Sequence, residues 1–139
     1  MSEAFSSISE MRSRHVSVVV HRPPSEVYEF AAEPDNLARW AAGLASSEVT
    51  REGDALLVTG PMGQVRVVFA DHNPYGVLDH DVTTPDGTTT SNPVRVVAHP
   101  EGAEVVFGVR QLALSDDELE RDADLVQADL ERLRELLEE

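Results

Sequence analysis

The hydrophobic pattern of the first forty residues changes from one continuous apolar run to a helical period. Residues His15–His21 are rich in valine, and this predicts a mostly buried strand because β-branched side chains favour strands. The pair Pro23-Pro24 ends the run, and proline is well tolerated in the first turn of a helix. Pro34 divides the helical stretch Ser25–Trp40 that follows. The pattern therefore predicts two short helices after the first strand.

Between residues 47 and 112 the period becomes two, and residues typical of turns separate short runs. Short turns between successive strands imply an antiparallel meander. Together with the first strand, this makes seven strands. The six expected here are Glu48–Arg51, Ala55–Thr59, Gln64–Asp71, Val77–Thr84, Thr88–His99 and Ala103–Leu112.

One long amphipathic helix is expected from Ser115 to Glu139. Ser115 and Glu118 have the spacing of a capping box at its start. Its apolar residues step by three and four, so they form a single stripe. A helix with such a stripe must cover a large apolar surface, and the sheet is the candidate. The stripe consists of Leu119, Ala123, Val126, Leu130, Leu133 and Leu137.

Three segments resemble the START and birch-allergen-like (SRPBCC) superfamily, and within it the bacterial polyketide cyclase/dehydrase-like proteins. They are Val16–Phe30, Pro34–Trp40 and Ala128–Leu133. The resemblance implies an α+β helix-grip fold, in which a seven-stranded antiparallel sheet curves around the last helix and encloses a cavity. We expect one such domain at 13–139, preceded by a flexible arm at 1–12. The superfamily includes ligand carriers, cyclases and chaperone activators, so the fold does not select an activity.

Charge and composition exclude several classes of function. Twenty-six acidic residues against 11 basic ones give a net charge of −15, which disfavours nucleic acid and anionic lipid as partners. No apolar run approaches the roughly 20 residues of a membrane span. The first residues lack the apolar core of a signal peptide, so the expected location is the cytoplasm. Cysteine and lysine are absent, which excludes thiol and Schiff-base chemistry.

His80 is the candidate for chemistry inside the cavity. Strand alternation places Leu78, His80 and Val82 on one face, and the two apolar neighbours make this the inner face. A neutral imidazole there could anchor a ligand or act as a general base. The alternative is a core histidine whose hydrogen bonds are satisfied by a neighbouring strand. We expect Asp79 and Asp81 to face solvent, and adjacent strand residues cannot share one metal ion, so no metal or cofactor is predicted.

Two arginines and several apolar residues complete the predicted site. Arg66 and Arg95 lie within valine-rich strands, and each faces outward or enters the cavity to hold an anionic group. Trp40 is expected at the cavity edge, as a structural lid or as a ligand contact. The other predicted ligand contacts are Phe69, Phe107, Val126 and Leu130.

These residues favour a binder of a small hydrophobic or aromatic ligand. One alternative is a cyclase or dehydratase that uses His80 in acid–base catalysis, with Arg66 or Arg95 stabilising an enolate. Another is an interaction module that docks a basic partner on the acidic last helix. A homodimer stays open, since no residue pattern points to it.

Overall fold

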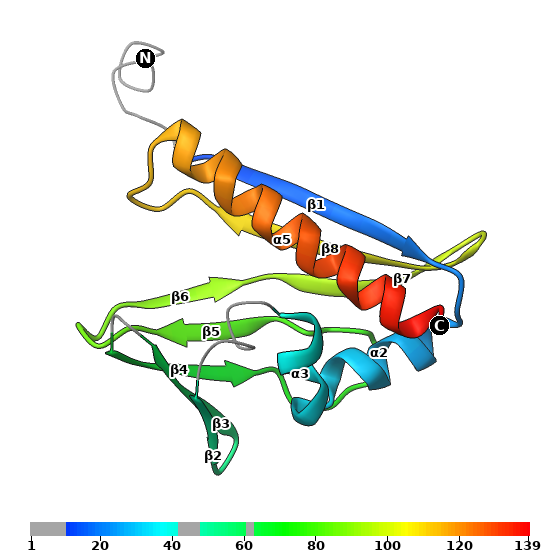
Figure 1. Ribbon diagram of the computed structural model, residues 1–139, viewed down its shortest axis with the longest axis horizontal. Helices are drawn as coiled ribbons and strands as arrows, with labels where there is room; N and C mark the ends of the chain where they lie inside the picture. The colour runs from blue at the N-terminus through cyan, green and yellow to red at the C-terminus, as the bar shows by residue number, and fades with distance from the viewer. Residues whose placement is uncertain (1–10, 42–47, 61–62) are drawn as a thin grey trace.

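The computed structural model describes residues 11–41, 48–60 and 63–139. Residues 1–10 of the expected arm at 1–12 therefore lie outside the described residues. Within these ranges, Figure 1 shows one long helix that runs alongside the first strand, with a second group of strands below it. In chain order the elements are β1 (Ser13–Val20), α2 (Pro24–Ala32), α3 (Pro34–Trp40), β2 (Glu48–Glu52), β3 (Ala55–Gly60), β4 (Gly63–Phe69), β5 (His80–Thr83), β6 (Thr89–Asn92), β7 (Val94–His99), β8 (Gly102–Arg110) and α5 (Asp116–Leu137).

The strands form two antiparallel sheets, so the prediction of one seven-stranded sheet is wrong. The described residues contain eight strands, with order β1-β8-β7 in one sheet and β2-β3-β4-β5-β6 in the other. The difference arises at Pro93, which divides the expected strand Thr88–His99 into β6 and β7. Proline has no backbone N–H to donate to a ladder. The chain passes there from the five-stranded to the three-stranded sheet.

The two sheets stay joined beside β7. Just before β5, the Gly76 carbonyl accepts a hydrogen bond from the Val96 N–H at 2.9 Å, and the Leu78 N–H donates one to the Val94 carbonyl at 2.8 Å. Gly76 has a φ of +74°, and a Cβ at this position would lie 2.2 Å from the carbonyl oxygen of Val96. Only glycine permits so close an approach with this backbone conformation. The junction of the sheets therefore depends on a residue without a side chain.

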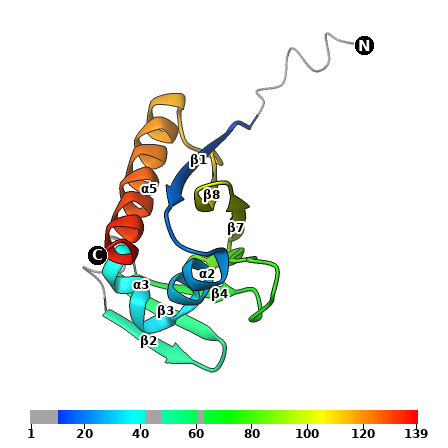
Figure 2. The ribbon, with the colours of Figure 1, turned by 90° about the vertical axis from the view of Figure 1, so that its right-hand side faces the viewer.

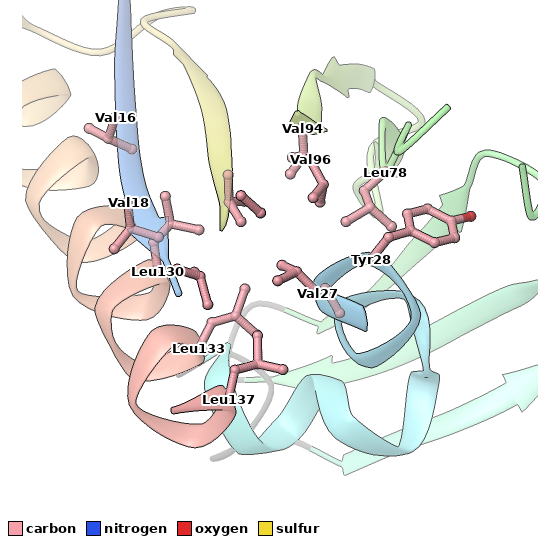
Figure 3. Packing of buried hydrophobic residues seen from close by; sticks show 14 of the residues in the cluster. Val16, Val18, Val27, Tyr28, Leu78, Val94, Val96, Leu130, Leu133 and Leu137 are labelled. Atoms are coloured by element: carbon pink, nitrogen blue, oxygen red, sulfur yellow. The ribbon is translucent and has the colours of Figure 1, made fainter. Parts of the chain in front are cut away.

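The last helix begins as the sequence predicts. The Ser115 hydroxyl accepts a hydrogen bond from the Glu118 backbone N–H, while the Glu118 carboxylate accepts one from the Ser115 N–H, which completes the capping box. Five residues of the predicted stripe are buried in α5 and Val126 is half-buried. Leu130 and Leu133 are fully buried beside Val18 of β1 (Figure 3). The stripe packs on β1 and β8 of the three-stranded sheet, and α2 and α3 lie at the C-terminal end of α5 (Figure 2).

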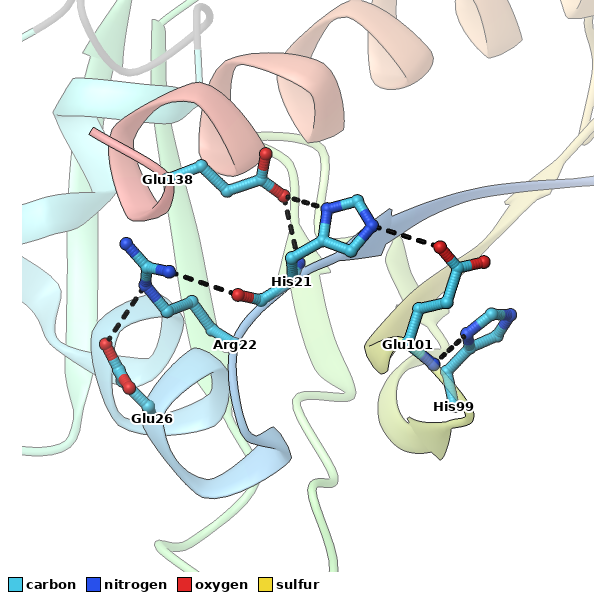
Figure 4. A network of polar contacts seen from close by, with 6 residues as sticks. All are labelled: His21, Arg22, Glu26, His99, Glu101 and Glu138. Atoms are coloured by element: carbon cyan, nitrogen blue, oxygen red, sulfur yellow. Dashed lines mark hydrogen bonds and ion pairs between the residues drawn. The ribbon is translucent and has the colours of Figure 1, made fainter.

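A polar network ties the end of α5 to the end of β1 (Figure 4). The Glu138 carboxylate accepts from the backbone N–H of His21 at 2.9 Å and lies 3.1 Å from its Nδ1. The carboxylate of Glu101 is 3.2 Å from the His21 Nε2. These two carboxylates raise the pKa of His21, because hydrogen bonds and charge favour the imidazolium. The network joins residues that are 117 positions apart.

Candidate functional site

A cavity of about 220 Å³ lies where the two sheets meet beneath the helices. The five-stranded sheet and the segment before β5 supply one wall, and β7 with β8 supplies another. Helices α2, α3 and α5 close the remaining side. The lining residues are Ala31, Leu37, Trp40, Ala41, Val67, Phe69, Leu78, His80, Val82, Val94, Phe107, Val126 and Asp129.

Strand alternation positions the polar centre of this cavity. Leu78, His80 and Val82 all line it, which confirms the predicted inner face of this segment. His80 pairs with Phe69 across the β4–β5 ladder. The ring centroids of these two residues are 4.8 Å apart, and the Phe107 ring meets His80 edge-on at 5.8 Å. The imidazole is therefore held between aromatic rings from both sheets.

The surroundings of His80 define its protonation state. Burial lowers the pKa of His80, although the hydrogen bond to Leu78 and the charges of Asp79 and Asp81 oppose this effect. The ring is therefore neutral at physiological pH. Its Nδ1 lies 3.2 Å from the carbonyl oxygen of Leu78. A carbonyl only accepts, so Nδ1 carries the proton and Nε2 keeps the lone pair that can accept a hydrogen bond.

Trp40 belongs to the cavity wall, but its indole nitrogen does not face the cavity space. Its indole Nε1 is buried, and it is the one buried side-chain nitrogen or oxygen that lacks a hydrogen-bond partner in the part of the chain that the structure describes. Indole nitrogen only donates. Such an unsatisfied donor is rare in folded proteins and calls for an explanation.

The structure brings five of the predicted contacts together and leaves three elsewhere. Trp40, Phe69, His80, Phe107 and Val126 line the cavity. Leu130 is fully buried in the core instead. The lining contains neither predicted arginine, because both belong to the opposite strand faces.

Arg95 and Arg66 instead form ion pairs at the surface. The Arg95 guanidinium makes two hydrogen bonds to Asp79, at 2.9 and 2.7 Å, and these lower the pKa of that carboxyl. Arg66 donates to Glu52 at 3.2 Å. This geometry therefore supports the alternative in which both arginines face outward and do not enter the cavity.

Several lining residues were not among the predicted contacts. Val67 could have been found from Phe69, because the two are separated by one residue on β4 and share its inner face. Leu37 lies three residues before Trp40 and four before Ala41, which is the spacing of one helix face. The sequence carries no comparable signal for Asp129, which lies on α5 between the buried stripe and the solvent face.

Two other hollows are less suited to enclose a ligand. The larger, of about 840 Å³, lies beside the start of α2 and the segment 72–76. Its wall includes Tyr75, which is 79% exposed, and His72, which contacts Glu29 at 2.7 Å. The other, of about 500 Å³, is a groove between α3 and α5 that shares Trp40 and Asp129 with the cavity. The cavity thus adjoins the surface at Trp40.

The described ranges contain neither a cluster of metal ligands nor a membrane-spanning helix. In them, no three His, Asp or Glu residues lie close enough together to hold a metal ion. Within the same ranges, no helix combines the length and apolar character that crossing a bilayer requires.

Comparison with known proteins shows what the chain resembles. The model of the family described as polyketide cyclase / dehydrase and lipid transport matches residues 11–138. No curated protein matches the chain.

Solved structures share the fold at low identity. An uncharacterised protein from Bacillus thuringiensis is 16% identical over 92% of this chain and 100% of its own, with a TM-score of 0.71. DynU16, from the dynemicin biosynthetic locus, is 17% identical over 91% of this chain and 47% of its own, with a TM-score of 0.69. Ara h 8.0201 is 12% identical, covering 92% and 98%, with a TM-score of 0.62. At these identities the likeness concerns the fold alone.

Proposed function

Because the chain belongs to the polyketide cyclase / dehydrase and lipid transport family, we propose that it binds a small hydrophobic or aromatic ligand in its cavity, with His80 as the polar anchor. The observation that carries this proposal is the cavity itself. Its wall is mostly aliphatic and aromatic, and few polar groups converge on it. This combination is typical of small-molecule sites, where apolar contacts give affinity and a few polar groups orient the ligand.

The state of His80 supports the same function. A neutral imidazole can enter an apolar cavity without the penalty of burying a charge. Its Nδ1 proton is held by Leu78, so Nε2 is the atom that can accept a hydrogen bond from a ligand. The aromatic rings of Phe69 and Phe107 limit how far the imidazole can turn. His80 would therefore present a fixed acceptor in an otherwise apolar site.

Native mass spectrometry of the protein purified from its own host tests the proposal. We expect a bound small molecule that is released under denaturing conditions. Val67→Phe adds bulk to the cavity wall and should abolish that additional mass. Val68→Phe is the matched control, because position 68 faces the other side of the same strand. Equal ligand occupancy in the two folded variants, or no ligand in the parent protein, would contradict the proposal.

A further inference from the structure

The volume of the cavity limits the size of its ligand. At about 220 Å³, it is smaller than most small-molecule pockets, which range from roughly 300 to 1,000 Å³. A dry apolar cavity of about 150 Å³ holds one benzene molecule. By that scale the cavity takes one substituted ring of roughly ten non-hydrogen atoms. A fused multi-ring compound or a long acyl chain would exceed it and would have to extend into the adjoining groove at Trp40.

One polar atom of the wall is complementary to a hydrogen-bond donor. His80 Nε2 is an acceptor, because Nδ1 already donates to Leu78. A hydroxyl group of the ligand can donate to it. A pure hydrocarbon would leave this acceptor buried and unsatisfied, which is unfavourable. The Trp40 Nε1 is buried out of reach of the cavity space, so it takes no part.

The charge of the protein favours a neutral ligand. The net charge of the chain is −15, and the acidic residue Asp129 forms part of the cavity wall. The described lining residues include neither arginine nor lysine. An anionic ligand would be repelled by this field and would find no basic side chain in the wall.

Building on the proposed function, we propose that the cavity selects a neutral single-ring compound that carries a hydroxyl group, with phenol as its simplest representative. The hydroxyl donates a hydrogen bond to His80 Nε2. The ring packs against Phe69 and Phe107. Size, polarity and charge of the cavity converge on this one class.

Calorimetric titration of the unmodified protein with matched probes tests the proposal. Toluene has the shape of phenol but is more hydrophobic, so a cavity blind to the hydroxyl would prefer toluene. We expect phenol to bind at least roughly tenfold more tightly than toluene, the scale of one hydrogen bond. Anisole can accept but cannot donate, and should lose most of that advantage. Benzoate and palmitate test charge and size, and should bind more weakly than phenol.

Two histidine variants locate the selectivity. His80→Leu should bring the affinities for phenol and toluene within about threefold of each other, because the acceptor is gone. His72→Leu is the matched control, since His72 is exposed and lies outside the cavity, and it should keep the preference. Trp40 is the single tryptophan of the chain, so a change in its emission on titration with phenol reports binding at this wall.

The outcomes separate this proposal from the proposed function. Phenol selectivity in the parent protein that disappears only in His80→Leu supports the proposal. Equal or tighter binding of toluene or anisole overturns the hydroxyl assignment, and tighter binding of palmitate overturns the size limit. Either result leaves a ligand-binding cavity in place. If no probe binds and native mass spectrometry finds no ligand, both proposals fail. The phenol, toluene and anisole comparison needs no variant, so it decides the matter even if His80→Leu does not fold.

Discussion

His80 lies directly opposite Phe69 in the β4–β5 ladder, and the two rings stack at a tilt of 32°. The pair matters because cross-strand neighbours on one face are the closest contacts in a sheet. Phe69 covers one side of the imidazole and keeps water away from it. The pairing therefore links a structural feature of the sheet to the neutral state of the histidine in the cavity.

The pKa of His80 should lie below the ordinary value near 6.5. Burial is the main cause of this lowering. Since the unfolded chain binds the proton more readily, the contribution of His80 to stability is complete above about pH 6.5. It declines as the pH falls from there through the lower folded-state pKa. NMR titration of the ring protons gives the pKa, and urea unfolding at several pH values gives the stability.

His80→Phe is the control for this pH dependence, because phenylalanine keeps a ring in the same place without a titrating group. We expect the fall in stability below about pH 6.5 to be smaller in this variant. A folded-state pKa for His80 at or above 6.5 would show that burial does not outweigh the opposing effects of Leu78, Asp79 and Asp81, and would remove the argument for a neutral anchor.

His21 should behave in the opposite way. Hydrogen bonds to Glu101 and Glu138 raise its pKa above the ordinary value. The stabilisation that the charged ring provides is therefore complete below about pH 6.5 and is lost as the pH rises through the folded-state value. NMR titration should place His21 above 6.5 and His80 below it in the same experiment. Glu138→Gln should shift the pKa of His21 downward, whereas Glu135→Gln should leave it unchanged because Glu135 pairs with Arg132.

Leu130 should be essential to the packing of α5 on the sheet. Its side chain is fully buried, and Leu130→Ala should lower the free energy of unfolding by about 2–5 kcal/mol. Leu125 lies on the same helix but is 65% exposed, so Leu125→Ala should change stability by less than about 0.5 kcal/mol. Chemical denaturation of both variants measures the contrast. Similar unfolding midpoints for the two would mean that the stripe does not face the sheet.

Gly76 should tolerate substitution far less well than Gly53. Both have a positive φ, +74° and +60°, so alanine is strained at either position. At Gly53 a Cβ would have no atom within 4 Å, whereas at Gly76 it would collide with Val96. Gly53→Ala should cost about 1–2 kcal/mol from the backbone alone, and Gly76→Ala distinctly more. Thermal unfolding of the two variants compares them, and equal losses would argue against the close approach of Gly76 to β7.

The sequence by itself determined the features that depend on neighbours along the chain. The capping box at Ser115 and the stripe of α5 follow from spacing within one helix, and Pro34 separates α2 from α3 because proline disrupts a continuing helix. Alternation also placed His80 on the inner face with Leu78 and Val82. Pro93 also argues against one long strand, but the predicted strand Thr88–His99 did not take this proline into account.

Only the tertiary structure decided which distant groups meet. Because valines flank Arg95 on both sides, the sequence did not determine which face of the strand its side chain occupies. In the structure the hydrogen bond to Asp79 holds it at the surface. Three further features cannot be recognised from neighbouring residues in the sequence. They are the unpaired Trp40 Nε1, the place of Asp129 in the cavity wall and the contact between His21 and Glu138. Periodicity and capping depend on residues a few positions apart, so they can be recognised in the sequence. The cavity arises where two sheets and three helices converge, and that convergence is fixed by packing between segments far apart in the chain.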